Sequence, residues 1–282
     1  MGVLPKPTVH TDALVLRVWP CGESSCIASL LTCEEGFIKV LAKAARKPGS
    51  RLRPLVEPSR LVNVEFSLDP GRDLQFLRGG SVELDPLTGD PTLEKSAFLL
   101  GAIELIDRCR PLGAAAGHRG AVDLFAVCEA YVRVLSSRTC LEPALLFFAL
   151  EWELLERHGM APEIDSCISC GSPIAELAGG PFWFSPGEGG LVCEDCSRGG
   201  VTGKRPLMTE ALDLLRVLAV QGLGVNTTEL MSGVMRREIG AALHHFMGYH
   251  LPGYRLPTAL DLLRSGRKNN SSLAQAGNDE LE

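Results

Sequence analysis

Four cysteines have the clearest chemical meaning in this chain. They form two Cys-x-x-Cys pairs with 22 residues between them: Cys167 and Cys170, then Cys193 and Cys196. Each pair bends the backbone so that two thiolates point to one side, and two such bends can surround Zn²⁺ with sulfur at about 2.3 Å. Because four thiolates fill the coordination shell, no water is left for activation. The spacing predicts a structural zinc site that stabilises the fold. The alternatives are a disulfide pair, a redox-active Cys-x-x-Cys pair, and a zinc-knuckle motif that has lost its metal.

The second feature is a run of positive charge between residues 39 and 60. Its cations are Lys39, Lys43, Arg46, Lys47, Arg51, Arg53 and Arg60, and only Glu57 opposes them. Gly49 and Ser50 lie at its centre, as in a loop. Cations on a loop suit phosphate contacts, which depend on salt and little on base sequence. A solvated charged loop is the alternative. On a small barrel we expect DNA to bind here, with Arg17 as a further candidate.

Composition and motifs limit the function. The 282 residues carry a net charge of −6, yet residues 1–80 hold eleven Lys and Arg against eight Asp and Glu. This asymmetry indicates that the first part meets a polyanion. The sequence lacks a P-loop, a dinucleotide-binding glycine motif, a Gly-x-Ser-x-Gly elbow and the His-x-Glu of a zinc deaminase. We therefore expect a binding protein rather than an enzyme. We interpret His244, His245 and His250 as surface or packing residues.

The hydrophobic pattern changes period along the chain. Short β-like segments separated by turn residues predict five strands: Ala13–Val18, Ile27–Thr32, Phe37–Lys43, Leu61–Phe66 and Leu74–Arg78. Five short strands favour an OB-fold barrel, with an SH3-like barrel as the alternative. Helical spacing then predicts helices over Thr92–Cys109, Ala121–Ser136, Pro143–Arg157, Glu210–Val220 and 226–250. Asn226 and Glu229 would form a capping box at the start of the last helix.

The expected architecture is an α+β multidomain protein. An N-terminal five-stranded OB-fold over residues 1–82 would bind DNA, and an all-helical domain over 83–265 would contain the Cys₄ zinc module at 163–200. The polar segment 266–282 is expected to be disordered.

The expected location is the cytoplasm. No apolar run is long enough for a membrane span, and the N-terminus has no secretory h-region. In a reducing compartment the other cysteines would remain thiols. They are Cys21, Cys26, Cys33, Cys109, Cys128 and Cys140.

Aromatic side chains could add base stacking to the DNA contact, but the barrel segment is poor in them. It holds Trp19, Phe37, Phe66 and Phe76, of which we expect Phe37 and Phe66 to pack the core. The expected mode of binding is therefore electrostatic, with little readout of base sequence.

Several short segments match, in combination, the pattern of a known family. In the barrel they are Ala13–Arg17, Gly22–Ser24, Leu30–Thr32, Gly36–Arg46, Ser50–Leu52 and Leu55–Pro58. Around the cysteines they are Cys167–Gly171, Phe184–Pro186 and Gly189–Cys193. From about Thr11 to Leu263 the chain resembles the RecO recombination mediators, in their zinc-containing version.

The resemblance implies an N-terminal OB-fold and a helical C-terminal domain that contains zinc. It implies binding of single- and double-stranded DNA, annealing of complementary strands, and cooperation with RecR and RecF. It also implies docking on the C-terminal tail of the single-stranded DNA-binding protein, SSB, so that RecA can replace SSB during repair. On this basis we expect a non-catalytic mediator associated with the nucleoid.

Two segments depart from the family pattern. Lys43-Ala44-Ala45-Arg46 stands where the family usually has Lys-Gly-Ala-Arg, so we expect a stiffer loop that keeps its cations. Some members place arginine after Pro-Ala-Leu, whereas here residues 143–145 are followed by Leu-Phe-Phe.

An SSB tail is acidic with apolar end residues, so it needs an apolar groove beside a cation. The expected groove combines Leu145, Leu146, Phe147 and Phe148 with Arg133 or Arg138, and Arg157 is a further cation nearby. A fully buried helix is the alternative, because this segment is more apolar than one amphipathic stripe.

Two other classes of function stay open. A zinc-ribbon transcription or chromatin protein would usually carry basic residues at the knuckles, yet residues 167–196 contain no Lys or Arg. A zinc hydrolase would need a ligand other than cysteine and a bound water.

Overall fold

The structure is a computed structural model that describes residues 7–89, 91–108, 117–176, 182–251 and 253–263. Cys109 and the tail expected to be disordered, residues 266–282, lie outside the described residues. Contacts divide the chain into two compact units, Met1–Ser137 with Pro257–Glu282 and Arg138–Leu256. The domain limits expected at residues 82 and 265 stay predictions.

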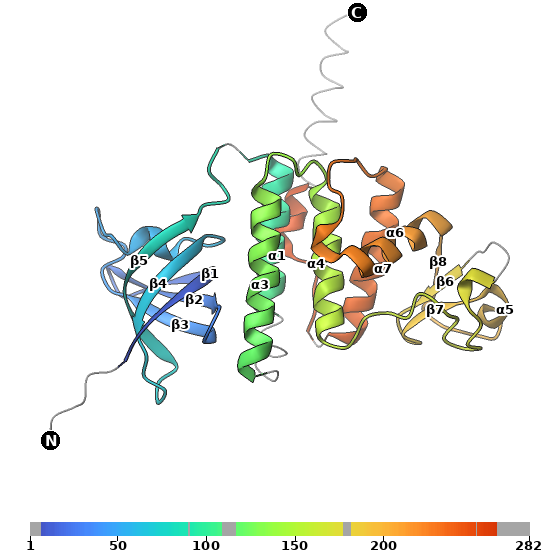
Figure 1. Ribbon diagram of the computed structural model, residues 1–282, viewed down its shortest axis with the longest axis horizontal. Coiled ribbons are helices and arrows are strands. Elements are labelled where there is room, and N and C mark those ends of the chain that lie inside the picture. Colours follow the sequence, from blue (N-terminus) through green and yellow to red (C-terminus); the bar gives the residue numbers. More distant parts are fainter. Residues whose placement is uncertain (1–6, 90, 109–116, 177–181, 252, 264–282) are drawn as a thin grey trace, which may run out of the picture. The chain divides into compact units, whose positions relative to one another are not determined.

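The first unit contains a closed five-stranded barrel (Figure 1). Its strands are β1 (Thr8–Cys21), β2 (Ser25–Thr32), β3 (Gly36–Ala42), β4 (Leu61–Ser67) and β5 (Leu74–Leu84), with the 3-10 helix η1 (Arg53–Val56) between β3 and β4. The order around the barrel is β1-β2-β3-β5-β4, and β3 pairs with β5 in parallel while the other pairs are antiparallel. A small closed Greek-key barrel of this kind is an OB-fold, so the predicted fold is confirmed.

β1 closes the barrel because it is long enough to pair on both sides. Residues 8–14 pair with β4, and residues 13–21 pair with β2. A β-bulge between Val15 and Arg17 shifts the register close to the point where the strand changes partner. Bulges bend a strand and increase its twist, which closure of a small barrel requires.

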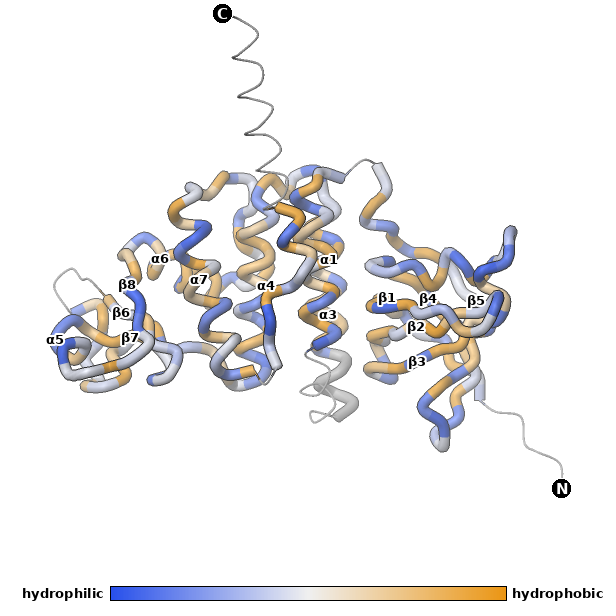
Figure 2. Tube along the Cα trace, turned by 180° about the vertical axis from the view of Figure 1, so that it is seen from behind, coloured by the Kyte–Doolittle hydropathy of each residue, from blue (hydrophilic) through white to orange (hydrophobic). Residues whose placement is uncertain are grey.

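Alternate side chains of the strands fill the barrel. The core cluster includes Ala13, Val15, Cys26, Ala28, Leu30, Val40, Ala42, Val62, Val64 and Phe66. Figure 2 shows hydrophobic stretches with interspersed hydrophilic residues along the barrel strands. Residues between the core positions point to the outer face, because successive side chains of a strand alternate.

Helices complete the first unit. They are α1 (Leu93–Arg108), α3 (Gly117–Ser136) and the 3-10 helix η4 (Thr258–Leu260). Thr92 caps α1, because its hydroxyl accepts a hydrogen bond from the backbone N–H of Lys95 at 3.1 Å. The two long helices are joined by fully buried Tyr131, whose hydroxyl donates to the backbone oxygen of Phe98 at 3.0 Å. α3 contacts β1, β2 and β3 and so covers part of the outer barrel face.

The second unit combines three long helices with a small sheet. The helices are α4 (Pro143–Arg157), α6 (Thr209–Gln221) and α7 (Gly233–His250), with the shorter α5 (Glu194–Ser197), η2 (Ile174–Glu176) and η3 (Gly222–Gly224). The antiparallel sheet has the order β7-β6-β8, from β6 (Phe182–Ser185), β7 (Gly190–Val192) and β8 (Arg205–Leu207). α4 packs against α6 and α7 and is buried from residue 143 to 152. No described helix is long and apolar enough to cross a membrane.

The predicted start of the last long helix is wrong. α7 begins at Gly233 rather than near Asn226, and its N-cap is Ser232, whose hydroxyl accepts from the backbone N–H of Met235 at 3.1 Å. Asn226 instead closes a turn by accepting from the N–H of Thr228 at 3.0 Å. The segment before α7 is held in this turned form by tertiary contacts, which a local capping pattern does not reveal.

One of these contacts is a buried ion pair. Glu142 is fully buried, and its carboxylate accepts from the guanidinium of Arg236 at 2.6 Å and from the backbone N–H of Met231 at 2.9 Å. The pair joins the start of α4 to the start of α7. Arg236 therefore has a structural partner in the second unit, whereas the next residue, Arg237, is exposed.

We predict that Arg236→Leu lowers the free energy of unfolding of the second unit by about 3 kcal/mol, because it leaves Glu142 buried without its cation. Urea unfolding followed by the fluorescence of buried Trp152 measures the change. Arg237→Leu is the matched control and should change stability by less than about 0.5 kcal/mol. Equal effects of the two substitutions would contradict the assigned role of the ion pair.

Candidate nucleic-acid interface and metal centre

The loop between β3 and η1 is held against the turn between β1 and β2. The backbone N–H of Ala44 donates to the hydroxyl of Ser25 at 3.1 Å, and that of Arg46 donates to the oxygen of Ser24 at 2.8 Å. The guanidinium of Arg46 also reaches the backbone oxygen of Gly22 at 3.3 Å. The first half of the basic loop is therefore ordered by three hydrogen bonds to a neighbouring turn.

The predicted DNA-contacting cations lie on the outside of the barrel. All seven are exposed: Arg17 on β1, Lys39 on β3, then Lys43, Arg46, Lys47, Arg51 and Arg53. Arg53 approaches Glu57 at 3.7 Å, but both side chains are largely solvated, so this pair holds the cation weakly. Exposed, loosely paired cations are available to phosphates; their role in DNA binding stays a prediction.

Arg60 differs from the other cations of the run. Its guanidinium contacts the carboxylate of Asp85 at 2.6 Å and donates to the backbone oxygen of Pro54 at 2.9 Å. It therefore ties η1 to the end of β5. Charge alone gave no signal that would separate this structural arginine from its exposed neighbours.

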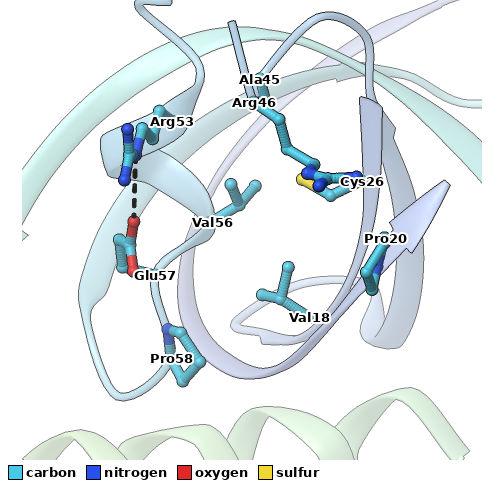
Figure 3. A pocket seen from close by; sticks show the side chains of 9 residues that line it. All are labelled: Val18, Pro20, Cys26, Ala45, Arg46, Arg53, Val56, Glu57 and Pro58. Atoms are coloured by element: carbon cyan, nitrogen blue, oxygen red, sulfur yellow. Dashed lines mark ion pairs between the residues drawn. The ribbon is translucent and has the colours of Figure 1, made fainter. Parts of the chain in front are cut away.

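A cavity of about 310 Å³ lies between η1 and the first two strands, inside the first unit. Figure 3 shows Val18 and Val56 pointing into it, with Arg46 along its wall. Cys26 also lines the cavity, and burial raises the pKa of its thiol more than the nearby Arg46 lowers it. Cys26 is therefore a protonated packing residue rather than a nucleophile.

The residue that replaces the family glycine has a strained backbone. Ala44 has a φ of 57°, in the left-handed region that glycine adopts without cost. Its neighbour Ala45 is buried in the barrel core. The loop thus keeps the glycine-type conformation although the chain has alanine there.

The expectation for the barrel aromatics was correct for Phe66 and wrong for Phe37. Phe66 is fully buried in the core cluster. Phe37 is only half-buried, because its neighbour Ile38 packs on the core and adjacent residues of a strand face opposite ways. Trp19 and Phe76 are half-buried as well, which leaves three rings of the barrel outside its core.

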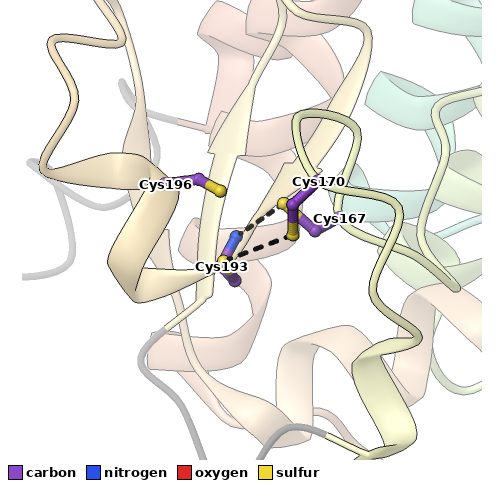
Figure 4. Close-up of side chains that lie close together, drawn as sticks. All are labelled: Cys167, Cys170, Cys193 and Cys196. Atoms are coloured by element: carbon purple, nitrogen blue, oxygen red, sulfur yellow. Dashed lines mark hydrogen bonds between the residues drawn. The ribbon is translucent and has the colours of Figure 1, made fainter.

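The four predicted zinc ligands converge (Figure 4). The sulfur atoms of Cys167, Cys170, Cys193 and Cys196 all lie within 4.8 Å of one another. Among the described residues they are the only group of three or more His, Cys, Asp or Glu side chains placed to share an ion. The predicted cluster is therefore confirmed as a site that could hold a metal ion.

Hydrogen bonds favour the thiolate at two of the four sulfurs, those of Cys167 and Cys170. The backbone N–H of Cys193 donates to the sulfur of Cys167 at 3.3 Å. Burial would raise the pKa of Cys167, but this N–H and that of Cys170 bring it below its ordinary value. Hydrogen bonding with the side chain and backbone of Ser172 lowers the pKa of Cys170 to about 6. The pKa of Cys196 is raised to about 12, mainly by hydrogen bonding with Cys193 and to a smaller extent by hydrogen bonding with Cys170. Four sulfurs this close together would repel one another as thiolates, so a cation is needed before all of them can ionise, which suits a thiolate-binding metal.

Close backbone packing joins the two cysteine pairs. Residue 163 pairs with β7, since the N–H of Leu191 donates to the oxygen of Glu163 at 2.8 Å. The N–H of Ile168 in turn donates to the oxygen of Leu191, also at 2.8 Å. A Cβ atom at Gly190 would overlap the backbone of Glu163. Gly190 is therefore required for the strand that leads into Cys193.

The residues of the predicted SSB groove are mostly buried. Leu146, Phe147 and Phe148 of α4 expose at most 4% of their surface, whereas Arg138 and Arg133 are exposed. Arg133 pairs with Glu129 at 2.7 Å. Within the described residues these apolar side chains therefore act first as core, and their contact with SSB stays a prediction.

A pocket of about 540 Å³ on the second unit touches α4 only through Leu145. Its walls come from α6, the turn before α7 and the first turn of α7, and none of its lining residues is Lys or Arg. Glu210, Asp213 and Glu229 line it. An acidic tail would be repelled by these carboxylates, so this pocket is a poor site for it.

Two of the α7 histidines, His244 and His250, have packing contacts. His244 Nδ1 lies 2.8 Å from the buried carboxylate of Glu151 and 2.9 Å from the hydroxyl of Tyr254. His250 Nε2 lies 2.9 Å from the backbone oxygen of Pro186. His245 is exposed, so the three side chains agree with the expectation that the α7 histidines are surface or packing residues.

Comparison with known proteins gives one consistent result. A family model described as "Recombination protein O N terminal" matches residues 6–83, and one described as "Recombination protein O C terminal" matches residues 91–259. Similar curated proteins are named "DNA repair protein RecO". That of Anaeromyxobacter dehalogenans (strain 2CP-C) is 34% identical over 250 residues, 88% of this chain and 93% of the relative. That of Bacillus pumilus (strain SAFR-032) is 27% identical over 238 residues, 84% of this chain and 87% of the relative.

We predict that Ala44→Gly raises the free energy of unfolding by up to about 1.5 kcal/mol. Glycine relieves about 1–2 kcal/mol of left-handed strain and adds about 0.4–1 kcal/mol of chain entropy to the unfolded state. Chemical denaturation measures the difference. Ala45→Gly is the matched control and should destabilise, because it removes a buried methyl group. A loss of stability at both positions would exclude strain at Ala44.

We predict that Gly190→Ala destabilises the cysteine module, because the added methyl group displaces the backbone of Glu163. Metal retained after gel filtration and the midpoint of thermal unfolding should both fall. Gly187→Ala, in the same hairpin, is the control, since its Cβ would meet only ordinary contacts with Tyr249. Normal metal retention in Gly190→Ala would show that this close approach is not needed.

Proposed function

Since the chain belongs to the RecO family of DNA repair proteins, we propose that it is a non-catalytic mediator of recombination repair. In this role it binds single- and double-stranded DNA and anneals complementary strands. With RecR and RecF it helps RecA to replace SSB on single strands. It works in the cytoplasm, where the nucleoid DNA lies.

The observation that carries this proposal is the anchored basic loop on an OB-fold barrel. Three hydrogen bonds hold the start of the loop, and its exposed cations extend from Lys43 to Arg53. Cations fixed in this way neutralise phosphates and release counterions without reading the bases. Neutralising two strands on one surface lowers their mutual repulsion, which is what annealing requires.

The cysteine cluster supports a structural role for the metal, which we propose to be Zn²⁺. Four sulfur ligands suit zinc and leave no open position for a water or a substrate, so a hydrolase is disfavoured. When bound, zinc supplies folding energy to a module whose sheet has only short strands. Arg198, the basic residue beside the second cysteine pair, contacts Glu194 at 2.6 Å and Asp195 at 3.4 Å. This local neutralisation also disfavours a zinc ribbon that reads DNA.

The second unit is the proposed docking region for the SSB tail. Leu145 reaches a surface pocket and Arg138 is exposed just before α4, but the acidic walls of that pocket oppose an acidic ligand. We therefore expect the tail to use a surface near Arg138 rather than the pocket itself. RecR, RecF and RecA are proposed as functional partners on family grounds, without assigned contacts.

We predict that Lys47→Gln with Arg51→Gln weakens binding to all DNA sequences alike and slows annealing. The slope of log affinity against log salt should fall by about one unit for each lost phosphate contact. Annealing of complementary oligonucleotides, with and without SSB at two salt concentrations, measures the effect. Arg198→Gln with Arg205→Gln removes the same charge from the cysteine module and should leave both unchanged. If both double variants lose affinity equally, the barrel loop is not the DNA site.

We predict one Zn²⁺ per chain in freshly purified, reduced protein, measured by elemental analysis. Cys196→Ser should lower the zinc content and destabilise the second unit more than the barrel, because it removes a ligand. Cys33→Ser, outside the cluster, should keep full zinc content. Absence of zinc in the reduced wild type would refute the proposal, as would nitrogen or oxygen in the first shell by X-ray absorption.

A further inference from the structure

The strand register places four apolar side chains in one row across the outer face of the barrel. Trp19 on β1 pairs with Ile27 on β2, Ile27 pairs with Leu41 on β3, and Leu41 pairs with Phe76 on β5. Directly paired residues point to the same face of a sheet. We call Trp19, Ile27, Leu41 and Phe76 the apolar row. All four are half-buried, so part of each side chain is accessible.

The row faces away from the core. The residues that alternate with it, among them Val18, Ala28 and Val40, belong to the core or pack on it. Further along the same outer face, Leu31 is fully buried although it points outward, and α3 contacts these strands. The accessible part of the face is therefore the end that lies nearer the turn between β1 and β2.

Cations lie on the rings at both ends of the row. The guanidinium of Arg17 is 5.3 Å from the centre of the Trp19 ring, and Nζ of Lys43 is 4.9 Å from the centre of the Phe76 ring. Lys39 lies in the same cross-strand row as Arg17, because Arg17 pairs with Ser29 on β2 and Ser29 pairs with Lys39 on β3. Arg17 and Lys39 are on one side of the row, each two residues before a row member on its strand, and Lys43 is on the other side, two residues after Leu41 and just past the end of β3.

We propose that the apolar row is a stacking platform for unpaired nucleobases, which gives the protein a preference for single-stranded over double-stranded DNA. The inference rests on the proposed DNA binding and adds the strand type that this face selects. Every base has an apolar ring face that can stack on an aromatic side chain without readout of sequence. In a duplex these ring faces are stacked on one another, so only the phosphates remain for the cations.

The dimensions fit a short stretch of single strand. Neighbouring strands are about 4.8 Å apart, so a row across four strands extends over about 14 Å, enough for a few bases. Residues two apart on one strand face the same side and lie about 7 Å apart, so the cations are placed beside the bases, where the phosphates would run. Arg17, Lys39 and Lys43 would hold the backbone while the row holds the bases. The positive charge of the rim also favours a nucleic acid over a cationic peptide as the occupant.

The test compares a labelled oligothymidine with a duplex of equal length by fluorescence anisotropy on the full-length protein. Trp19→Leu and Phe76→Leu remove a ring and keep an apolar side chain. Each should weaken single-strand binding by about 5- to 100-fold and change duplex binding by less than about twofold. The salt slope should stay unchanged, because no phosphate contact is lost. Trp19→Tyr should restore most of the single-strand affinity.

Phe37→Leu is the matched control, because it removes an outward ring of the same barrel at the end nearer α3; it should leave both affinities unchanged. Thermal unfolding of each variant reports correct folding. Unchanged single-strand affinity in folded Trp19→Leu and Phe76→Leu would overturn the platform while leaving DNA binding by the loop intact. Equal losses for single strand and duplex would overturn it as well. A wild type that binds neither DNA would refute both the proposed function and this inference.

Discussion

Closure of the barrel through β1 is the constraint on which the proposed DNA surface depends. Before the bulge the odd-numbered residues Ala13 and Val15 face the core, whereas after it the even-numbered residue Val18 does. The bulge therefore exchanges which residues of β1 point inward and which point outward. A shift of one residue moves every later side chain to the opposite face. One extra residue therefore places Arg17 and Trp19 outside together, in register with the cation and the apolar residues of β3.

The second unit is stabilised by different interactions. α4 is too apolar to be a surface helix, and it is enclosed by α6 and α7. Two carboxylates are nevertheless fully buried there, Glu142 beside Arg236 and Glu151 beside His244. Each carboxylate bonds α4 to a particular residue of α7 and so sets the position of one helix along the other. A purely hydrophobic contact would define this position less closely. The cysteine module has short strands and little core of its own, so a metal ion compensates for missing hydrophobic burial.

Much of the architecture follows from sequence because it depends on local pattern. The five strands and the Cys₄ cluster are set by alternation and spacing. The turned segment before α7 could not be predicted, since Asn226 caps a turn that the backbone near Glu142 stabilises from a distant part of the chain. The apolar row was missed for a related reason. Trp19 and Phe76 are 57 residues apart in sequence, and only the strand register shows that they share a face.

The hydrogen bonds between the basic loop and the turn that contains Gly22 and Ser24 also have a kinetic consequence. A loop that is already ordered loses little conformational entropy when DNA arrives, so encounter needs no slow rearrangement of the protein. In the proposed DNA complex its cations would act through counterion displacement, and such contacts can exchange one at a time between neighbouring phosphates. In the proposed role, a strand bound at this loop would be able to slide without being released. For a mediator that anneals strands, as proposed above, such sliding would let the search for correct base pairing proceed without dissociation.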